Sequence, residues 1–349
     1  MKQFYNRQNP VIALWLGVMC FAIIVTLSIG GVTRLTESGL SITEWNPVFG
    51  ILPPTNDASW NIEFDKYKQY PEYIEHNTGM SISEFKSIYL LEFIHRIAGR
   101  VTSLVYVLPL IFFFIRGYIG SRDTGMYMLA LLLLALQGVM GWYMVKSGLI
   151  SKPYVSHYCL AGHLMLAVFL YIIMFWQLMM NSFDVMLLVS DIRVCHLSFW
   201  CLLSISLLLI QMMLGAFTAG LDAGLVYNSF PLMGEGLIPY ELLENNLSIE
   251  NWSDPVFIQF IHRMIAYLLF VVICVFCLHG LHLGNSKFLR ITIYVFLALI
   301  LQMSLGIVTL LYNVPIIPAL LHQLGAVLLL SCLLWSYFLI KSSAILKKS

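Results

Sequence analysis

Four of the nine histidines in this chain of 349 residues occur as two matched pairs. The segment Phe-Ile-His-Arg occurs twice and places His95 and His262 at equivalent positions. His163 and His322 are also equivalent, because each is followed four residues later by Ala-Val. All four lie in apolar runs, where an ionisable side chain is costly and usually functional.

The four histidines suit a cofactor that needs two ligands in each half. Imidazole is a common axial ligand of heme iron, and the core of a helical bundle is a usual place for such a cofactor. Each histidine lies about five to nine residues into its run, a spread in depth of roughly 6 Å at 1.5 Å per residue. Hydrogen bonding between helices is the alternative role, but four histidines in one layer favour heme ligation.

In each half, one arginine directly follows the first histidine of the pair. Arg96 comes after His95, and Arg263 comes after His262. Arginine binds planar carboxylates, such as heme propionates, through two parallel hydrogen bonds. The alternative is that these long side chains extend to lipid headgroups.

One half carries an acid where the other carries an amide. Glu92 lies three residues before His95 and so shares its helix face, whereas the equivalent residue before His262 is Gln259. The asymmetry predicts proton chemistry in the first half and cofactor binding in the second. A contact with lipid headgroups is the alternative role for Glu92.

The other histidines are weaker candidates. His157 lies six residues before His163, about 240° around a helix, so the two rings cannot both face one iron, and the repeat favours His163. Three histidines are expected near the cytoplasmic edge and one in an outer loop: His196, His279, His282 and His76.

The composition predicts that membrane-spanning helices position these side chains. Hydrophobic residues make up 60% of the chain and charged residues 11%, against about 25% charged in soluble proteins. The net charge of +1 offers no basic surface for nucleic acid. A spanning helix needs about 20 apolar residues. Eight runs qualify: 11–32, 90–115, 124–145, 154–180, 195–217, 256–280, 291–312 and 316–340.

The repeat extends beyond the histidines. Residues 137–141 (QGVMG) match 302–306 (QMSLG), and the residues after the first and fifth runs also match. We therefore predict an all-α integral membrane protein of two pseudo-symmetric four-helix bundles, residues 1–180 and 181–349. Duplication of this kind also occurs in transporters.

Lysine and arginine in the short loops predict the orientation. The loop 218–255 carries six acids and no lysine or arginine, so we expect it and loop 33–89 to lie outside and both termini to be cytoplasmic. Lys146 and Lys152 are the exceptions. The absence of an Arg- and Ser-rich transit segment favours a bacterial plasma membrane.

Several motifs resemble the heme A synthase family. They are the Glu92-to-Arg96 segment, its partner at His262-Arg263, and the duplicated plan with four histidines. The loop from Gly30 through Trp45-Asn-Pro47 to Pro54, and the loop from Gly215 to Pro231, also resemble those of the family. Neither long outer loop contains cysteine, as in the cysteine-lacking branch of proteobacteria and mitochondria.

The resemblance implies a reaction and a set of ligands. The family oxidises the C8 methyl group of heme O to a formyl group, giving heme A for cytochrome oxidase. By resemblance, His262 and His322 hold heme b, His95 and His163 bind the substrate heme, and Glu92 is catalytic. The implied partners are heme O, the lipid bilayer, the farnesyl-transferring heme O synthase and cytochrome oxidase assembly factors. Two alternatives remain, a diheme b-type electron carrier and a transporter built from a repeat.

Overall fold

The computed structural model of the chain describes residues 9–44, 50–150, 154–183, 193–244, 252–283 and 286–345. Eight of the helices in this part of the chain are long and apolar enough to cross a bilayer, which confirms the predicted fold class and number of spans. They are α1 (Pro10–Leu35), α4 (Ile82–Ile115), α5 (Ser121–Ile150), α6 (His157–Ser182), α7 (Arg193–Gly220), α9 (Pro255–His282), α10 (Ser286–Leu311) and α11 (Ile316–Ile345).

Helix α4 begins well before the apolar run that predicted it. The run suggested a start near residue 90, whereas the helix begins at Ile82. The Ser81 hydroxyl accepts a hydrogen bond from the Glu84 N–H, and the Glu84 carboxylate accepts one from the Ser81 N–H. This capping box stabilises polar turns that an apolar pattern does not reveal.

The outer segment between α1 and α4 contains two short helices, α2 (Asp57–Tyr67) and α3 (Pro71–Glu75). Buried aromatic side chains join α2 to the start of α4. The Phe85 ring stacks on the rings of Phe64 and Tyr67, with centroids 4.9 Å and 5.2 Å apart. This segment, predicted only as a loop, therefore has a small core of its own.

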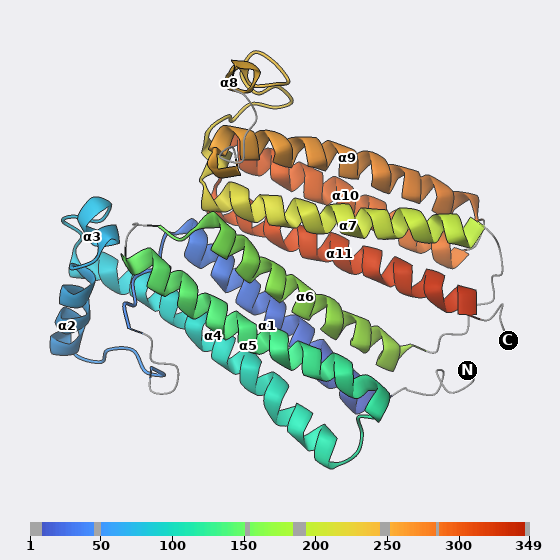
Figure 1. Cartoon of the computed structure of the whole chain (residues 1–349), viewed down its shortest axis with the longest axis horizontal. Coiled ribbons are helices and arrows are strands. Elements are labelled where there is room, and N and C mark those ends of the chain that lie inside the picture. The colour runs from blue at the N-terminus through green and yellow to red at the C-terminus, as the bar shows by residue number, and fades with distance from the viewer. Residues whose placement is uncertain are drawn as a thin grey trace. The chain divides into compact units, whose positions relative to one another are not determined.

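Helices α7, α9, α10 and α11 form a four-helix bundle. Helix α9 contacts α7 and α10, and α11 contacts α10 and α7. Figure 1 shows these four helices side by side, with the short helix α8 (Tyr240–Glu244) in the connection between α7 and α9.

Helices α1, α4, α5 and α6 are linked by hydrogen bonds between their side chains and backbones. The Thr26 and Thr102 hydroxyls share a hydrogen bond of 2.9 Å between α1 and α4. The Tyr106 hydroxyl of α4 donates to the Tyr127 carbonyl of α5 at 2.6 Å. The Gln137 amide of α5 donates to the backbone carbonyl of His163 in α6 at 2.9 Å.

The chain divides into two compact units by its internal contacts. One is Val18–Tyr171, and the other is Met1–Gly17 together with Ile172–Ser349. The halves 1–180 and 181–349, and their pseudo-symmetry, stay predictions.

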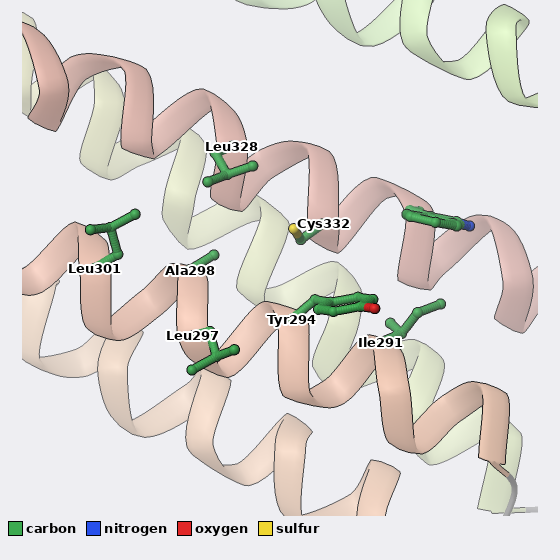
Figure 2. Close-up of a pocket in the computed structure, with 8 residues that line it drawn as sticks. Ile291, Tyr294, Leu297, Ala298, Leu301, Leu328 and Cys332 are labelled. Atoms are coloured by element: carbon green, nitrogen blue, oxygen red, sulfur yellow. The ribbon is translucent and has the colours of Figure 1, made fainter.

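An apolar groove lies on the surface where α10 and α11 meet (Figure 2). Tyr294 and Leu297 of α10 face Leu328 and Cys332 of α11 there. None of the candidate histidines lines the groove, and its aliphatic and aromatic lining is typical of a surface in contact with lipid.

Glu72 is a buried acid in α3, outside the membrane-spanning helices. Its side chain is 6% exposed, and its Oε2 atom has no hydrogen-bond partner among the described residues. Burial raises the pKa of this carboxyl group from its ordinary 4.5 to about 8, although a hydrogen bond from Tyr67 acts in the opposite direction. The folded outer segment therefore favours a neutral Glu72.

We predict that the outer segment loosens as the pH rises toward 8. The folded pKa lies above the unfolded value of 4.5, so the stability that a neutral Glu72 contributes is full below pH 4.5 and is lost as the pH approaches about 8. Limited proteolysis of residues 57–80 should speed up over this range in the wild-type protein. In Glu72→Gln the amide stays neutral, so cleavage should depend less on pH. Equal pH dependence in the two proteins would contradict the assignment.

Candidate functional site

His95 of α4 and His163 of α6 belong to the same unit and interact electrostatically. Both rings are half-buried, and each packs against a glycine of a neighbouring helix. A Cβ atom at Gly30 of α1 would lie 2.9 Å from His95 Cε1. A Cβ atom at Gly141 of α5 would lie 3.6 Å from His163 Cε1.

The same arrangement recurs in the other unit with His262 of α9 and His322 of α11. These two side chains also interact electrostatically, and both are half-buried. A Cβ atom at Gly215 of α7 would lie 3.4 Å from His262 Cε1, and one at Gly306 of α10 would lie 2.7 Å from His322 Cε1. The structure thus brings each predicted pair of histidines together within one unit.

These four glycines were not predicted from the sequence to belong to the candidate site. Gly30 and Gly215 each lie three residues before a threonine of the repeat, and Gly141 and Gly306 end the matched QGVMG and QMSLG segments. The repeat itself was therefore the signal that could have identified them. Only the packing shows that each glycine leaves room for a histidine ring.

The ring nitrogens test whether these residues fit heme. The Nδ1 atom of His322 lies 3.1 Å from the Gln302 carbonyl oxygen, which suits donation by an N–H and leaves Nε2 with its lone pair. Histidines that bind a metal usually donate their other N–H in this way. The buried Nδ1 atoms of His95 and His163 have no hydrogen-bond partner among the described residues. Two imidazoles in each unit match the two axial positions of heme iron, so the residues fit.

The His262 ring has a side-chain amide, that of Gln211, close to both of its nitrogens. The Gln211 amide nitrogen lies 3.1 Å from its Nδ1 and 3.2 Å from its Nε2, and it donates to the His262 backbone carbonyl at 3.0 Å. This amide orients the ring from α7. Sequence analysis did not single out Gln211.

His157 is the first residue of α6 and is buried. Its ring lies 4.0 Å from that of Tyr158. The packing of His163 against Gly141 and its interaction with His95 favour His163 as the ligand. The choice between the two histidines stays a prediction.

Glu92 and Arg96 form a buried ion pair that holds the first outer loop. Glu92 is 2% exposed, and its Oε1 accepts hydrogen bonds from Arg96 Nε at 3.1 Å and Nη2 at 2.7 Å. Its Oε2 accepts from the Ser41 hydroxyl and the Ile42 N–H, both at 2.7 Å. Arg96 also donates to the carbonyls of Ile42 and Glu44, at 2.8 Å and 3.0 Å. Removing one partner of such a pair costs about 3–5 kcal/mol.

Gln259 and Arg263 hold the outer loop of the second unit in a related way. The Gln259 amide and Arg263 Nη2 donate to the Tyr227 carbonyl at 3.0 Å and 2.7 Å, and Arg263 Nη1 donates to the Ser229 carbonyl at 2.9 Å. Tyr227 and Ile42 are equivalent, because each lies three residues after a matched glycine of the repeat. Both arginines therefore bind the same loop carbonyl in their own unit.

These contacts give each predicted charged residue a structural role. Heme propionates would have to share Arg96 and Arg263 with loop carbonyls. The Nε atom of Arg263 is buried without a partner among the described residues, so it is the donor still available. Propionate binding by either arginine stays a prediction. Glu92 lies in the protein interior, bonded to the loop.

Part of the family-like loop motif, Trp45-Asn46-Pro47, lies outside the described residues.

Comparison with known proteins supports the resemblance over nearly the whole chain. Residues 13–334 match the COX15-CtaA family, described as cytochrome oxidase assembly protein. The chain is 51% identical over 336 residues to "Heme A synthase" of Rickettsia africae and 52% identical over 336 residues to that of Rickettsia conorii; each match covers 96% of this chain and 100% of the relative. A third relative of that name, from Rickettsia bellii, is 50% identical over 329 residues, which cover 94% of this chain and 98% of the relative. The chain therefore belongs to the COX15-CtaA family of cytochrome oxidase assembly proteins.

Proposed function

We propose that this chain is a membrane oxidoreductase that oxidises the C8 methyl group of heme O to a formyl group, giving heme A for cytochrome oxidase. The identity of about half of all residues with proteins named heme A synthase supports this reaction. The observation that carries it in the structure is the recurring contact of a histidine with a glycine, found for two histidines in each unit.

The two units have different roles in this proposal. His262 and His322 hold heme b, and His95 and His163 bind heme O. When bound, heme b supplies electron transfer. Ligation of the substrate by His95 and His163 fixes the ring, so that one methyl group is presented in a constant orientation.

Glu92 is the catalytic residue of the proposal. It lies about one helical turn from His95, the proposed ligand of the substrate iron, and a carboxylate beside a bound substrate can take up or release a proton. The equivalent position in the heme b unit is Gln259, and the neighbouring Ser41 is replaced there by Val226. A diheme b-type electron carrier has no need for this asymmetry, so the asymmetry favours substrate conversion over electron transfer alone.

The proposed location is the bacterial inner membrane with both termini cytoplasmic. The acidic loop 218–255 and the segment with α2 and α3 then lie outside. Lys146, an exception to the charge rule, places its ammonium group 5.0 Å from the centre of the Trp142 ring on its own helix. Four residues used for the orientation lie outside the described residues, as does the other exception, Lys152. They are Lys2, Arg7, Lys347 and Lys348. The farnesyl-transferring heme O synthase and oxidase assembly factors are proposed partners.

The histidine variants test the reaction and the division of roles together. In cells that make heme O but no heme A, the wild-type chain should yield extractable heme A. His262→Ala and His322→Ala should lower the heme b of the purified protein, because each removes an axial ligand. His95→Ala and His163→Ala should keep heme b and abolish conversion. If cells that express the wild-type chain yield no heme A, the proposed function is wrong. If all four variants lose heme b equally, the assignment of heme b to one unit and heme O to the other is wrong.

The glycine contacts predict a difference between two matched substitutions. In Gly306→Ala the new Cβ would lie 2.7 Å from His322 Cε1, so the ring must move, whereas in Gly215→Ala the distance to His262 Cε1 is an ordinary 3.4 Å. We expect Gly306→Ala to weaken heme b binding about tenfold, the usual scale for disturbing the support of a metal ligand. Gly215→Ala should keep its heme b. Absorbance spectra of the two purified variants measure this, and equal heme b in both would contradict the prediction.

Thiol labelling tests the orientation. A cysteine at Glu241 of α8 should react with an impermeant maleimide added to intact cells. Ser121, the first residue of α5, is also exposed and is the matched control, since Ser121→Cys should react only after lysis. The reverse pattern would show that the termini lie outside.

A further inference from the structure

Ser41 is a buried hydroxyl beside the Glu92 carboxylate. Its side chain is 2% exposed, and its Oγ lies within hydrogen-bond distance of three acceptors. They are Glu92 Oε2 at 2.7 Å, the Ser38 carbonyl at 3.0 Å and the Ile88 carbonyl at 3.4 Å. A hydroxyl has one proton to donate and also accepts hydrogen bonds, so Ser41 can donate to only one of these oxygens at a time.

The other donors to Glu92 are fixed. The Ile42 N–H belongs to the backbone, whose direction is held by the bond from Arg96 to the carbonyl of the same residue. The Arg96 guanidinium keeps its protons in proteins and is itself held by the Ile42 and Glu44 carbonyls. Ser41 is therefore the one donor among these that can turn away without movement of the backbone or a charged group.

The second unit lacks this hydroxyl. Val226 occupies the position equivalent to Ser41, since it follows the matched Gly224-Leu225 as Ser41 follows Gly39-Leu40. The amide of Gln259, which has no proton to exchange with a substrate, replaces the carboxylate of Glu92. A rotating hydroxyl thus accompanies the acid and is absent beside the amide.

We propose that Ser41 is a positioning residue that lets Glu92 take up and release a proton without opening the outer loop. This inference rests on the proposed function. While Glu92 is a carboxylate, Ser41 donates its proton to Oε2. When Glu92 takes up a proton from the substrate and carries it on Oε2, the Ser41 hydroxyl turns to donate to the Ser38 carbonyl and accepts the new hydrogen bond from Oε2–H. Release of the proton reverses the rotation. One proton is gained and lost by Glu92, and Ser41 makes and breaks no covalent bond.

The surroundings of Glu92 allow this role to be separated from general loop stability. Ser41→Ala removes the hydroxyl but keeps the hydrogen bonds from Arg96 to the Ile42 and Glu44 carbonyls. It also keeps the hydrogen bond from the Ile42 N–H to Glu92. Other titratable groups nearby are Arg96 and Tyr89 on α4, Tyr67 on α2 and Glu72 on α3, and none of them is altered in this variant.

The test measures heme A formed from heme O over time in isolated membranes, from about pH 5.5 to about pH 8.5. Ser41→Ala should keep wild-type heme b and the wild-type proteolysis pattern of the outer loop. Its conversion should be about tenfold slower, the scale of one lost hydrogen bond to a charged group. The shape of its pH profile should also differ from that of the wild type, because the hydroxyl that exchanges its hydrogen bond with the Glu92 carboxyl group is gone.

Two further variants keep the proposal open to refutation. Ser41→Thr retains the hydroxyl and should restore the rate and the pH profile. Ser41→Cys nearly retains the size of the side chain but is a weak donor. It should show the slower conversion expected of Ser41→Ala, and it provides the test if the alanine variant fails to fold. Val226→Ser is the matched control and should change neither heme b nor the pH profile.

The outcomes separate the two hypotheses. If wild-type membranes make no heme A, the proposed function fails. If wild-type membranes are active and Ser41→Ala or Ser41→Cys matches them in rate and pH profile, only the role of Ser41 fails. An impaired Ser41→Thr with an intact outer loop would also overturn the role of the hydroxyl.

Discussion

Hydrocarbon offers no hydrogen-bond partners, and this constraint determines where the chain can place polar groups. Within the spans the backbone is bonded to itself in helices. Short polar contacts join two of the spanning helices to the outer loops, as in the ion pair of Glu92 with Arg96 in α4, which also binds the first loop, and the contacts of Arg263 in α9 with loop carbonyls. Each arginine donates hydrogen bonds to backbone carbonyls of a loop, and the loop in turn shields the arginine. The conformation of each outer loop therefore depends on two side chains of one helix, Glu92 and Arg96 in α4 and Gln259 and Arg263 in α9.

Much of the fold could be predicted, because apolar length alone identifies a spanning helix. The limits of that signal are visible at α4, whose first two turns are polar and are stabilised by the Ser81–Glu84 cap. Helices α2 and α3 were missed for a related reason. Their stability comes from aromatic side chains spaced irregularly along the chain, such as Phe64 and Phe85, which meet only after folding.

The candidate site could be predicted as residues but not as contacts. The repeat identified four histidines, and the structure places them in two pairs. The sequence could not show that Arg96 binds backbone carbonyls, because every residue has a carbonyl and no residue type indicates which one is bound. Nor could it connect Ser41 to Glu92, which lie 51 residues apart. The glycines were present in the matched segments, but the sequence does not show which helix packs against each glycine and so which histidine ring it makes room for.

The contacts of Glu92 and Arg96 with the first outer loop and those of Gln259 and Arg263 with the second also differ in a way that bears on how such a protein could diverge after duplication. Glutamate and glutamine codons differ by a single base, so the exchange between an acid at position 92 and an amide at position 259 is one mutational step. Serine and valine codons differ by two bases, and alanine is an intermediate. Because both arginines hold the same loop carbonyl, the loop can stay in place while the neighbouring side chains change. After a duplication, the shared arginine contact would thus leave the side chains beside it free to change in either half.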